Sequence, residues 1–302
     1  MDKLIYKGNL RDFKTFAEAG ITKGSYNERA IKYFQYLGAT ANDFNTAYKQ
    51  ALAIGGFTPL QLFANGEQGA WYDPSDLSTL FQDAAGTTPV TADGDPVGLM
   101  LDRSGNGNHA SQSVAASRPI YRTDGTLRWL QFDGVDDWLS TDVISAGSPV
   151  TAQITAGVRP TRTVDQILVE YGESNANTGH FYMTVLESLK YKFLANGATG
   201  GGLTDIVEIA YAAIPETVVI TGIADLSQPV KRIRRNGVDG TSAVGSAGTF
   251  TDRALYIGSR AGTGFFFASA LYGTVLQFGG SLSEQNITNT EKFVAGRAGV
   301  TL

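Results

Sequence analysis

The stretch Leu101–Ala110 reads LDRSGNGNHA, and a second stretch, Leu130–Leu139, reads LQFDGVDDWL. Both place Asp, Asn and Gly residues directly beside apolar ones. Glycine permits tight reversals of the chain, and Asp and Asn side chains hydrogen-bond to the backbone of the turns they occupy. The two stretches therefore predict corners of a β-sheet protein, where a loop is joined to a strand. In the second, Phe132 and Trp138 are expected to point into the core on either side of a turn at Asp133.

The same residue types also suit a calcium site. Calcium takes about 6–8 oxygen ligands from carboxylates, amide groups and backbone carbonyls. The candidate ligands are Asp102, Asn106, Asn108, Asp133, Asp136 and Asp137. The EF-hand pattern is absent, and the sequence does not show whether two separate loops converge. Turn corners and a calcium site both stay open, and no other cofactor is expected.

The composition favours an all-β body with a substantial core. The chain has 302 residues, of which 42% are hydrophobic, and its 36 glycines follow no repeat period. Many glycines without a period indicate many turns. The absence of cysteine excludes a disulfide framework, a Cys-ligated zinc site and a cysteine nucleophile, and it fits folding in a reducing cytoplasm.

The net charge of −5 argues against nucleic acid and against an anionic membrane as partners. Binding phosphates requires clustered Lys and Arg. The one basic run, KRIRRNG at Lys231–Gly237, is interpreted as a solvated hairpin strand. No run approaches the roughly 20 apolar residues of a membrane span, and the first residues, MDKLIYKGNLRDF, lack the apolar core of a signal peptide.

Residues 1–66 are expected to form a small helical module. Ser25 and Glu28 have the spacing of a capping box, and apolar residues at helical spacing run to Gly38 and again to Gly55. Two short helices joined by a tight link make a hairpin that is marginal by itself. Its aromatic face is too large to cover itself, so we expect a virion-attachment or oligomerisation module that packs on other copies or on another protein.

Residues 67–302 are expected to form a β-sandwich. Short runs rich in β-branched and aromatic residues alternate with turn residues, and no fixed-period repeat indicates a propeller or a solenoid. Asn196-Gly197 and Asn236-Gly237 each follow such a run and predict type I′ hairpins. Near the end of the chain, Ser283 is a good N-cap for a short amphipathic helix, with Leu282 and Ile287 as a hydrophobic staple.

The order of these features resembles the concanavalin A-like lectin/glucanase superfamily, in the laminin-G-like form common in bacteriophage structural proteins. The resemblance rests on LDRSGNGNHA, on LQFDGVDDWL, on later strands that include LYIGSRAGTGFFFASALYGTVLQFGG and on the terminal helix; it covers roughly Ala70–Leu302. It implies a mainly β fold, a two-sheet antiparallel jelly-roll sandwich with a small N-terminal α-helical module and a short C-terminal helix. It also implies, in many members, carbohydrate binding.

Binding of a sugar requires aromatic faces beside polar groups. The candidates are Trp71, Tyr72, Asp73, Tyr171, Tyr182 and Tyr191. Aromatic residues of β-sandwiches usually fill the core, so packing is the alternative for each ring.

No catalytic residue is expected, because the Glu-x-Asp-x-x-Glu strand pattern of the glucanases is absent, and Glu170 and Glu173 would face opposite sides of a strand.

The resemblance implies a phage virion protein of the tail-fibre, receptor-binding or capsid-fibre type, assembled in the host cytoplasm, that binds host-surface carbohydrate. Its expected partners are other virion proteins, identical copies and the glycan. The alternatives are a purely structural decoration or spacer protein and a glycan hydrolase.

Overall fold

The computed structural model describes residues 57–173, 178–198, 206–211 and 213–302. The chain divides into two compact units, Met1–Thr58 and Pro59–Leu302. The predicted helical module of residues 1–66 lies mostly outside the described residues. The described part of the second unit contains the strands predicted for residues 67–302.

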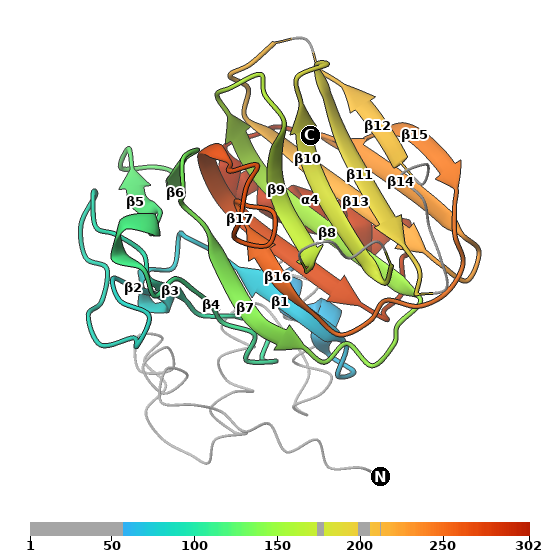
Figure 1. Cartoon of the computed structure of the whole chain (residues 1–302), viewed down its shortest axis with the longest axis horizontal. Coiled ribbons are helices and arrows are strands. Elements are labelled where there is room, and N and C mark those ends of the chain that lie inside the picture. Colours follow the sequence, from blue (N-terminus) through green and yellow to red (C-terminus); the bar gives the residue numbers. More distant parts are fainter. Residues whose placement is uncertain (1–56, 174–177, 199–205, 212) are drawn as a thin grey trace, which may run out of the picture. The chain divides into compact units, whose positions relative to one another are not determined.

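Among the described residues, two antiparallel sheets make up most of the second unit (Figure 1). Sheet A has the order β15 (Val238–Val244), β14 (Val230–Arg235), β13 (Val218–Asp225), β8 (Thr151–Pro160), β17 (Ala268–Phe278), β6 (Arg128–Asp133) and β5 (Ile120–Thr123), and β1 (Gln68–Tyr72) also pairs with β17. Sheet B has the order β12 (Ile206–Ala210), β11 (Lys190–Asn196), β10 (His180–Leu186), β9 (Gln166–Gly172), β16 (Arg253–Ile257), β7 (Leu139–Ile144), β4 (Ala110–Ser111), β3 (Leu99–Met100) and β2 (Leu80–Phe81). In the described ranges, three short 3₁₀ helices lie between strands or before them: η1 (Pro59–Phe63), η2 (Leu77–Thr79) and η3 (Ala115–Ser117). The prediction of a mainly β fold with two antiparallel sheets is confirmed.

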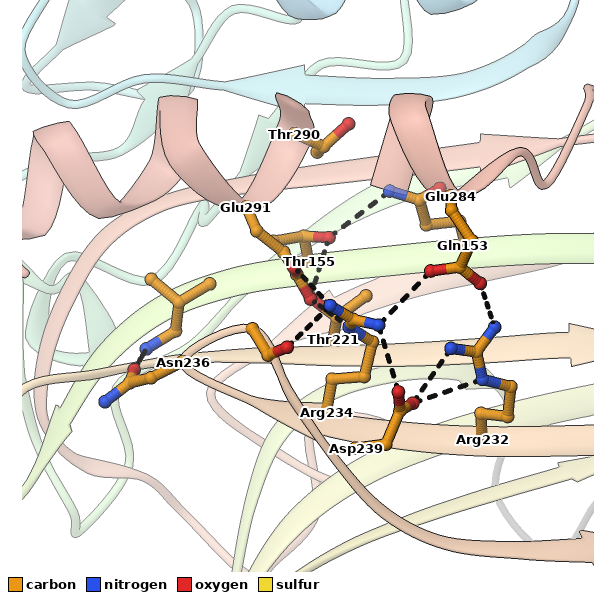
Figure 2. Close-up of polar contacts among 12 residues, drawn as sticks. Gln153, Thr155, Thr221, Arg232, Arg234, Asn236, Asp239, Glu284, Thr290 and Glu291 are labelled. Atoms are coloured by element: carbon orange, nitrogen blue, oxygen red, sulfur yellow. Dashed lines mark hydrogen bonds and ion pairs between the residues drawn. The ribbon is translucent and has the colours of Figure 1, made fainter. Parts of the chain in front are cut away.

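The core lies between the two sheets because apolar and polar residues alternate along the strands. In β8, Ile154 and Ala156 belong to the core, whereas Gln153 and Thr155 face the outer side of sheet A (Figure 2). Sheet B contributes Phe181, Met183, Val185, Tyr191 and Phe193 to the same cluster. One continuous apolar core therefore joins both sheets.

Strand β17 lies inside sheet A and is buried over its whole length. One of its edges pairs with β8, and the other pairs with β6 near the start of β17 and with β1 near its end. The pairing with β1 requires glycine at position 69, since a Cβ there would stand 2.0 Å from the backbone oxygen of Leu276. A side chain at Gly69 would push β1 away from β17.

The two predicted Asn-Gly hairpins have different outcomes. Asn236 and Gly237 both have positive φ and connect β14 to β15, as predicted. The prediction for Asn196-Gly197 is wrong, because β11 and β12 are joined through residues 197–205 and not by a two-residue turn. Glycine is needed at position 197 for a close approach instead, since a Cβ would lie 2.3 Å from the backbone oxygen of Ala247.

Helix α4 (Glu284–Ala298) confirms the predicted C-terminal helix. The Ser283 hydroxyl accepts a hydrogen bond from the Asn286 N–H at 3.2 Å, and Gly299 ends the helix in the left-handed conformation. The helix packs on sheet A over β8, β17 and β13. In the described part of the chain, no helix combines the length and the apolar character that crossing a membrane requires.

The contact between α4 and sheet A contains a buried ion pair (Figure 2). Arg234 of β14 binds Glu291 of α4 through Nε–Oε1 at 2.9 Å and Nη2–Oε2 at 3.2 Å. The Nη1 of Arg234 lies 3.2 Å from Asp239 Oδ2 and 3.3 Å from Glu284 Oε2. The side chains of Arg234 and Glu291 are 8% and 1% exposed. The basic run at Lys231–Gly237 is therefore a hairpin strand, as predicted, but the predicted solvation is wrong at Lys231 and at Arg234, both of which are buried.

Candidate functional site

The first motif is a hydrogen-bonded corner built around Asp102. Its Oδ1 accepts hydrogen bonds from the backbone N–H groups of Trp71 (2.9 Å) and Ser104 (2.8 Å). Its Oδ2 accepts from the Ser104 hydroxyl (2.7 Å) and from the N–H of Asn108 (3.0 Å). Both carboxylate oxygens are therefore engaged by donors of the protein itself.

Asn106 and Asn108 fasten the same loop to β1. Both side-chain amides donate to the backbone oxygen of Gly69, at 3.2 Å and 2.7 Å. His109 Nδ1 accepts a hydrogen bond from the Asp102 N–H at 3.0 Å. The motif thus holds the strand that pairs with β17, and its hydrogen bonds are those that the turn interpretation predicts.

The second motif brings three carboxylates together. One oxygen from each of Asp133, Asp136 and Asp137 lies within 4.8 Å of the other two. The same residues also close a turn, since Asp133 Oδ1 accepts from the Val135 N–H at 2.8 Å and Asp137 Oδ2 accepts from the Asp133 N–H at 2.9 Å. Burial raises the pKa of Asp137 to about 6; the hydrogen bond from Asp133 opposes this, and the charges of Asp133 and Asp136 add to it. Calcium binding at this corner stays a prediction. Of the predicted carboxylate ligands, Asp133, Asp136 and Asp137 lie together, and Asp102 does not belong to this group.

From the raised pKa of Asp137 we predict how the stability of the protein depends on pH. The folded state retains this proton above the ordinary value of 3.8, so the contribution of Asp137 to stability is lost as the pH rises through about 6. Asp137→Asn keeps an acceptor for the Asp133 N–H and carries no charge. We expect the variant to be about 2–3 kcal/mol more stable than the native protein at pH near 8, and equal to it near pH 4.

Urea denaturation at the two pH values measures this difference, and a gain that is the same at both would contradict it. Calcium added near pH 8 provides the metal test. If the cluster binds the ion, calcium stabilises the native protein and leaves Asp137→Asn unchanged.

Three of the predicted sugar-binding residues lie in the core between the sheets. Tyr72, Tyr171 and Tyr191 are fully buried there. The hydroxyl of Tyr171 donates to the backbone oxygen of Thr251 at 2.8 Å, and that of Tyr191 donates to Glu216 Oε1 at 2.8 Å. Burial on this scale leaves no ring face for a saccharide, and these residues have the contacts of packing residues.

Trp71 and Asp73 lie under α4 and the first motif. The Trp71 ring meets Phe293 of α4 edge to face, with 5.6 Å between ring centroids. Asp73 is buried and forms ion pairs with Arg103 (3.0 Å) and with Arg297 of α4 (3.1 Å). These two candidates join β1 to the loop and to the helix, and they do not face solvent.

Tyr182, the sixth candidate, lies on the outer side of sheet B. Its ring stacks on His180 with 6.2 Å between centroids, and the register places it beside Glu170. Glu170 Oε2 accepts from the Ala261 N–H at 2.9 Å, and Oε1 lies 3.9 Å from Arg260 Nε. Burial raises the pKa of Glu170 to about 7, and the Arg260 charge and the Ala261 hydrogen bond oppose this rise. Glu170 is only 2% exposed. Its contacts with Arg260 and Ala261 therefore hold the loop that follows β16 against sheet B.

A pocket of about 260 Å³ opens on the outer side of sheet A. Ala270 of β17 lines its centre, and the strand register places Gln131 of β6 on one side and Arg159 of β8 on the other. A small side chain between two long polar ones leaves a depression in the sheet surface. Thr217, which precedes β13, and Asp124, in the turn between β5 and β6, also line it.

Two aromatic rings form one wall of this pocket. The rings of Trp129 and Tyr272 are 5.8 Å apart between centroids, with an angle of 44° between their planes. Trp129 is half-buried, and its Nε1 donates to Gln131 Oε1 at 3.3 Å. Tyr272 forms one apolar cluster with Ala270 and with Ala298 at the end of α4, and Trp129 packs against this cluster. The helix therefore supports an aromatic wall that remains partly open to solvent.

The charges of the pocket lie on opposite sides. Asp124 Oδ1 accepts hydrogen bonds from the N–H groups of Leu127 (2.7 Å) and Thr126 (2.8 Å), which hold the pKa of this carboxyl below its usual range. Burial raises the pKa of Tyr272, while a hydrogen bond with Thr217 opposes the rise, so the phenol stays protonated at neutral pH. The pocket therefore presents a carboxylate on the β5–β6 side and the Arg159 guanidinium on the β8 side.

None of the pocket residues was a candidate from the sequence. One signal was available, because Trp129 and Gln131 alternate with the core residues Leu130 and Phe132 in RWLQFD. That alternation identifies Trp129 as an outward-facing indole. The other lining residues come from strands far apart in the sequence and meet only through the strand order of sheet A.

Comparison with known proteins finds similarity of fold. No protein-family model matches the chain, and no curated protein matches it. Among solved structures, the receptor-binding domain of botulinum neurotoxin type G is 12% identical with a TM-score of 0.49, over 64% of this chain and 48% of that one. The sialidase CBM40 of Ruminococcus gnavus bound to α2,3-sialyllactose is 13% identical with a TM-score of 0.40, over 48% of this chain and 83% of that one. Trypanosoma rangeli sialidase is 13% identical with a TM-score of 0.49, over 78% of this chain and 34% of that one.

The chain thus spans about half the length of the neurotoxin domain and about a third of the trypanosomal sialidase. These likenesses concern the fold alone.

Proposed function

We propose that this protein is a glycan-binding protein and that the pocket beside Trp129 holds the saccharide. The observation that carries the proposal is a partly open indole face next to an amide, a guanidinium, a carboxylate and a hydroxyl in one depression. Apolar ring faces stack on the C–H faces of sugars, and convergent polar groups fix their hydroxyls. The volume is near the lower end of the roughly 300–1,000 Å³ typical of ligand pockets, which suits a short saccharide or the end of a longer chain.

The binding is proposed to be non-catalytic. Hydrolysis of a glycosidic bond uses two carboxyl groups about 5–10 Å apart. Among the described residues that line the pocket, Asp124 is the one carboxylate. A saccharide in this pocket therefore meets binding groups without the second carboxyl group of a hydrolase.

The wider role proposed is that of a bacteriophage virion protein, of the tail-fibre, receptor-binding or capsid-fibre type, that binds host-surface carbohydrate. Its support is the resemblance of Ala70–Leu302 to the laminin-G-like jelly-roll domains of phage structural proteins. Residues 1–66 are proposed to join the protein to other virion proteins or to identical copies. The protein would be assembled in the host cytoplasm and act in the virion.

Trp129→Ala tests the glycan-binding proposal in the full-length chain. Removing the indole face is expected to weaken binding to host-surface polysaccharide by about 30-fold or more, the equivalent of at least 2 kcal/mol for a central aromatic contact. Binding to a panel of purified surface polysaccharides by calorimetry or on a glycan array measures the effect. Ala270→Leu, which fills the centre of the pocket, is expected to give a loss of similar size.

Phe265→Ala is the matched control, because it removes an exposed ring from a loop that does not line the pocket. It should bind like the native chain. A native protein that binds none of the polysaccharides, in monomeric or multivalent form, contradicts the proposal and favours a structural spacer. Unchanged binding by both pocket variants places the saccharide elsewhere.

A further inference from the structure

Arg159 is placed in the pocket without a partner. It lies on the outer side of β8, next to Ala270 of β17, and its side chain is exposed. Within the part of the chain that the structure describes, its guanidinium makes no hydrogen bond and no ion pair. The other arginines in the described ranges have such partners, with the exception of Arg128. An unpaired guanidinium at the edge of a pocket retains its full capacity to bind an anion.

The guanidinium group matches one kind of anion especially well. Its planar fork of N–H donors forms two parallel hydrogen bonds with a carboxylate, and such charge-assisted pairs are stronger than neutral ones. The Trp129 ring lies in the same pocket, so a sugar ring stacked there has its substituents within the pocket that Arg159 lines. A saccharide that carries a carboxylate can use both contacts together.

Asp124 and Arg159 place opposite charges at the two ends of the pocket. Asp124 lies in the turn after β5, whereas Arg159 lies on β8, and β17 and β6 separate these two strands in sheet A. Its Oδ1 is engaged by two backbone N–H groups. Its charge repels an acidic group at that end, and its second oxygen accepts a hydrogen bond from a sugar hydroxyl. One orientation of an acidic sugar therefore satisfies both ends of the pocket.

We propose that the pocket selects saccharides that bear a carboxylate, such as uronic or ulosonic acids, and that Arg159 binds this carboxylate. The inference rests on the proposed glycan-binding function of the same pocket. The net charge of −5 repels acidic glycans at a distance, so the selection arises from this local contact. Its strength therefore decreases as added salt screens the pair.

The test compares acidic oligosaccharides with their methyl esters, using the full-length protein and calorimetry. A methyl ester has the same ring and hydroxyl groups but no charge, so the pair isolates the carboxylate. Oligogalacturonate and a sialylated trisaccharide are the two probes. The native protein is expected to bind at least one acid about 10-fold or more tightly than its ester. Arg159→Gln is expected to remove this preference while retaining the weaker binding of the ester.

Arg128→Gln is the matched control. Arg128 is also unpaired among the described residues, but it lies next to Trp129 on β6, faces the opposite side of the strand and does not line the pocket. It should keep the preference for the acid. Arg159→Lys, which keeps the charge but loses the fork, is expected to keep part of the preference.

The outcomes separate the two proposals. The proposed selection for acidic saccharides is overturned if the native protein binds acids and esters equally, or if Arg159→Gln keeps the preference for the acid. Neither result contradicts the glycan-binding function. Failure of the native protein to bind any saccharide, acidic or neutral, overturns the glycan-binding function and the selection with it.

Discussion

Replacing Arg234 with methionine is expected to lower the free energy of unfolding by about 3–5 kcal/mol, because it leaves a buried charge without its partner. Glu291 of α4 is 1% exposed, and each of its two carboxylate oxygens accepts a hydrogen bond from Arg234. Water does not replace the lost guanidinium at this depth. The helix that supports the Trp129 wall therefore depends on this pair for its position.

The matched control is Arg232→Met on the same strand. Arg232 also binds Asp239 and Glu284, but those carboxylates are 51% and 62% exposed, so its loss should cost less than about 1 kcal/mol. The double variant Arg234→Met/Glu291→Leu removes both charges and should recover most of the stability. Urea denaturation of the four proteins measures these differences. A cost for Arg234→Met no larger than that for Arg232→Met contradicts the buried pair.

Replacing Glu170 with glutamine is expected to stabilise the protein at alkaline pH by about 3 kcal/mol. Burial raises the pKa of Glu170 from 4.5 to about 7, so the folded state holds a proton that the unfolded state has released. The contribution of this group to stability is complete below pH 4.5 and is lost as the pH rises through about 7. Each pKa unit corresponds to about 1.4 kcal/mol. Glutamine keeps an acceptor for the Ala261 N–H and avoids the buried charge.

The comparison is made between pH 4 and pH 8, using the difference between variant and native protein. His180 acts in the opposite direction, because burial lowers its pKa to about 4 and its protonation destabilises the fold as the pH falls below 6.5. That contribution is common to both proteins and cancels in the difference. Glu173→Gln, at a carboxylate that is 58% exposed, is the control and should change stability little at either pH. Parallel stability curves for Glu170→Gln and the native protein would refute the assignment.

Local patterns in the sequence predicted much of the sandwich. The Asn236-Gly237 turn and the Ser283 cap each depend on neighbouring residues, and each appears in the structure. The turn prediction for Asn196-Gly197 was wrong because glycine is required there by a close backbone contact with Ala247, which lies far along the chain. A dipeptide signal does not distinguish a turn from a close approach of two backbones.

The buried ion pair and the pocket could not be predicted in this way. Arg234 was expected in solvent because its charge is readable from the sequence, whereas its partner Glu291 lies 57 residues further along. The pocket is formed by side chains that neighbour one another only after β6, β17 and β8 are placed side by side. The aromatic candidates chosen from the sequence were mostly those that complete the core. Trp129 differs from the candidates in the core by its phase along the strand, which turns its ring to the outer side of sheet A.

The measurement that tests the central claim most directly uses the three tryptophans of the chain. In ¹H–¹⁵N spectra of the full-length protein, each indole N–H gives its own signal. Trp129 lines the pocket, Trp71 is buried against α4, and Trp138 packs on Tyr256 of sheet B. Adding a saccharide that the protein binds is predicted to shift the indole N–H signal of Trp129 and to leave the signals of Trp71 and Trp138 unchanged. A shift confined to Trp138, or binding without any change at Trp129, would contradict a saccharide site on sheet A.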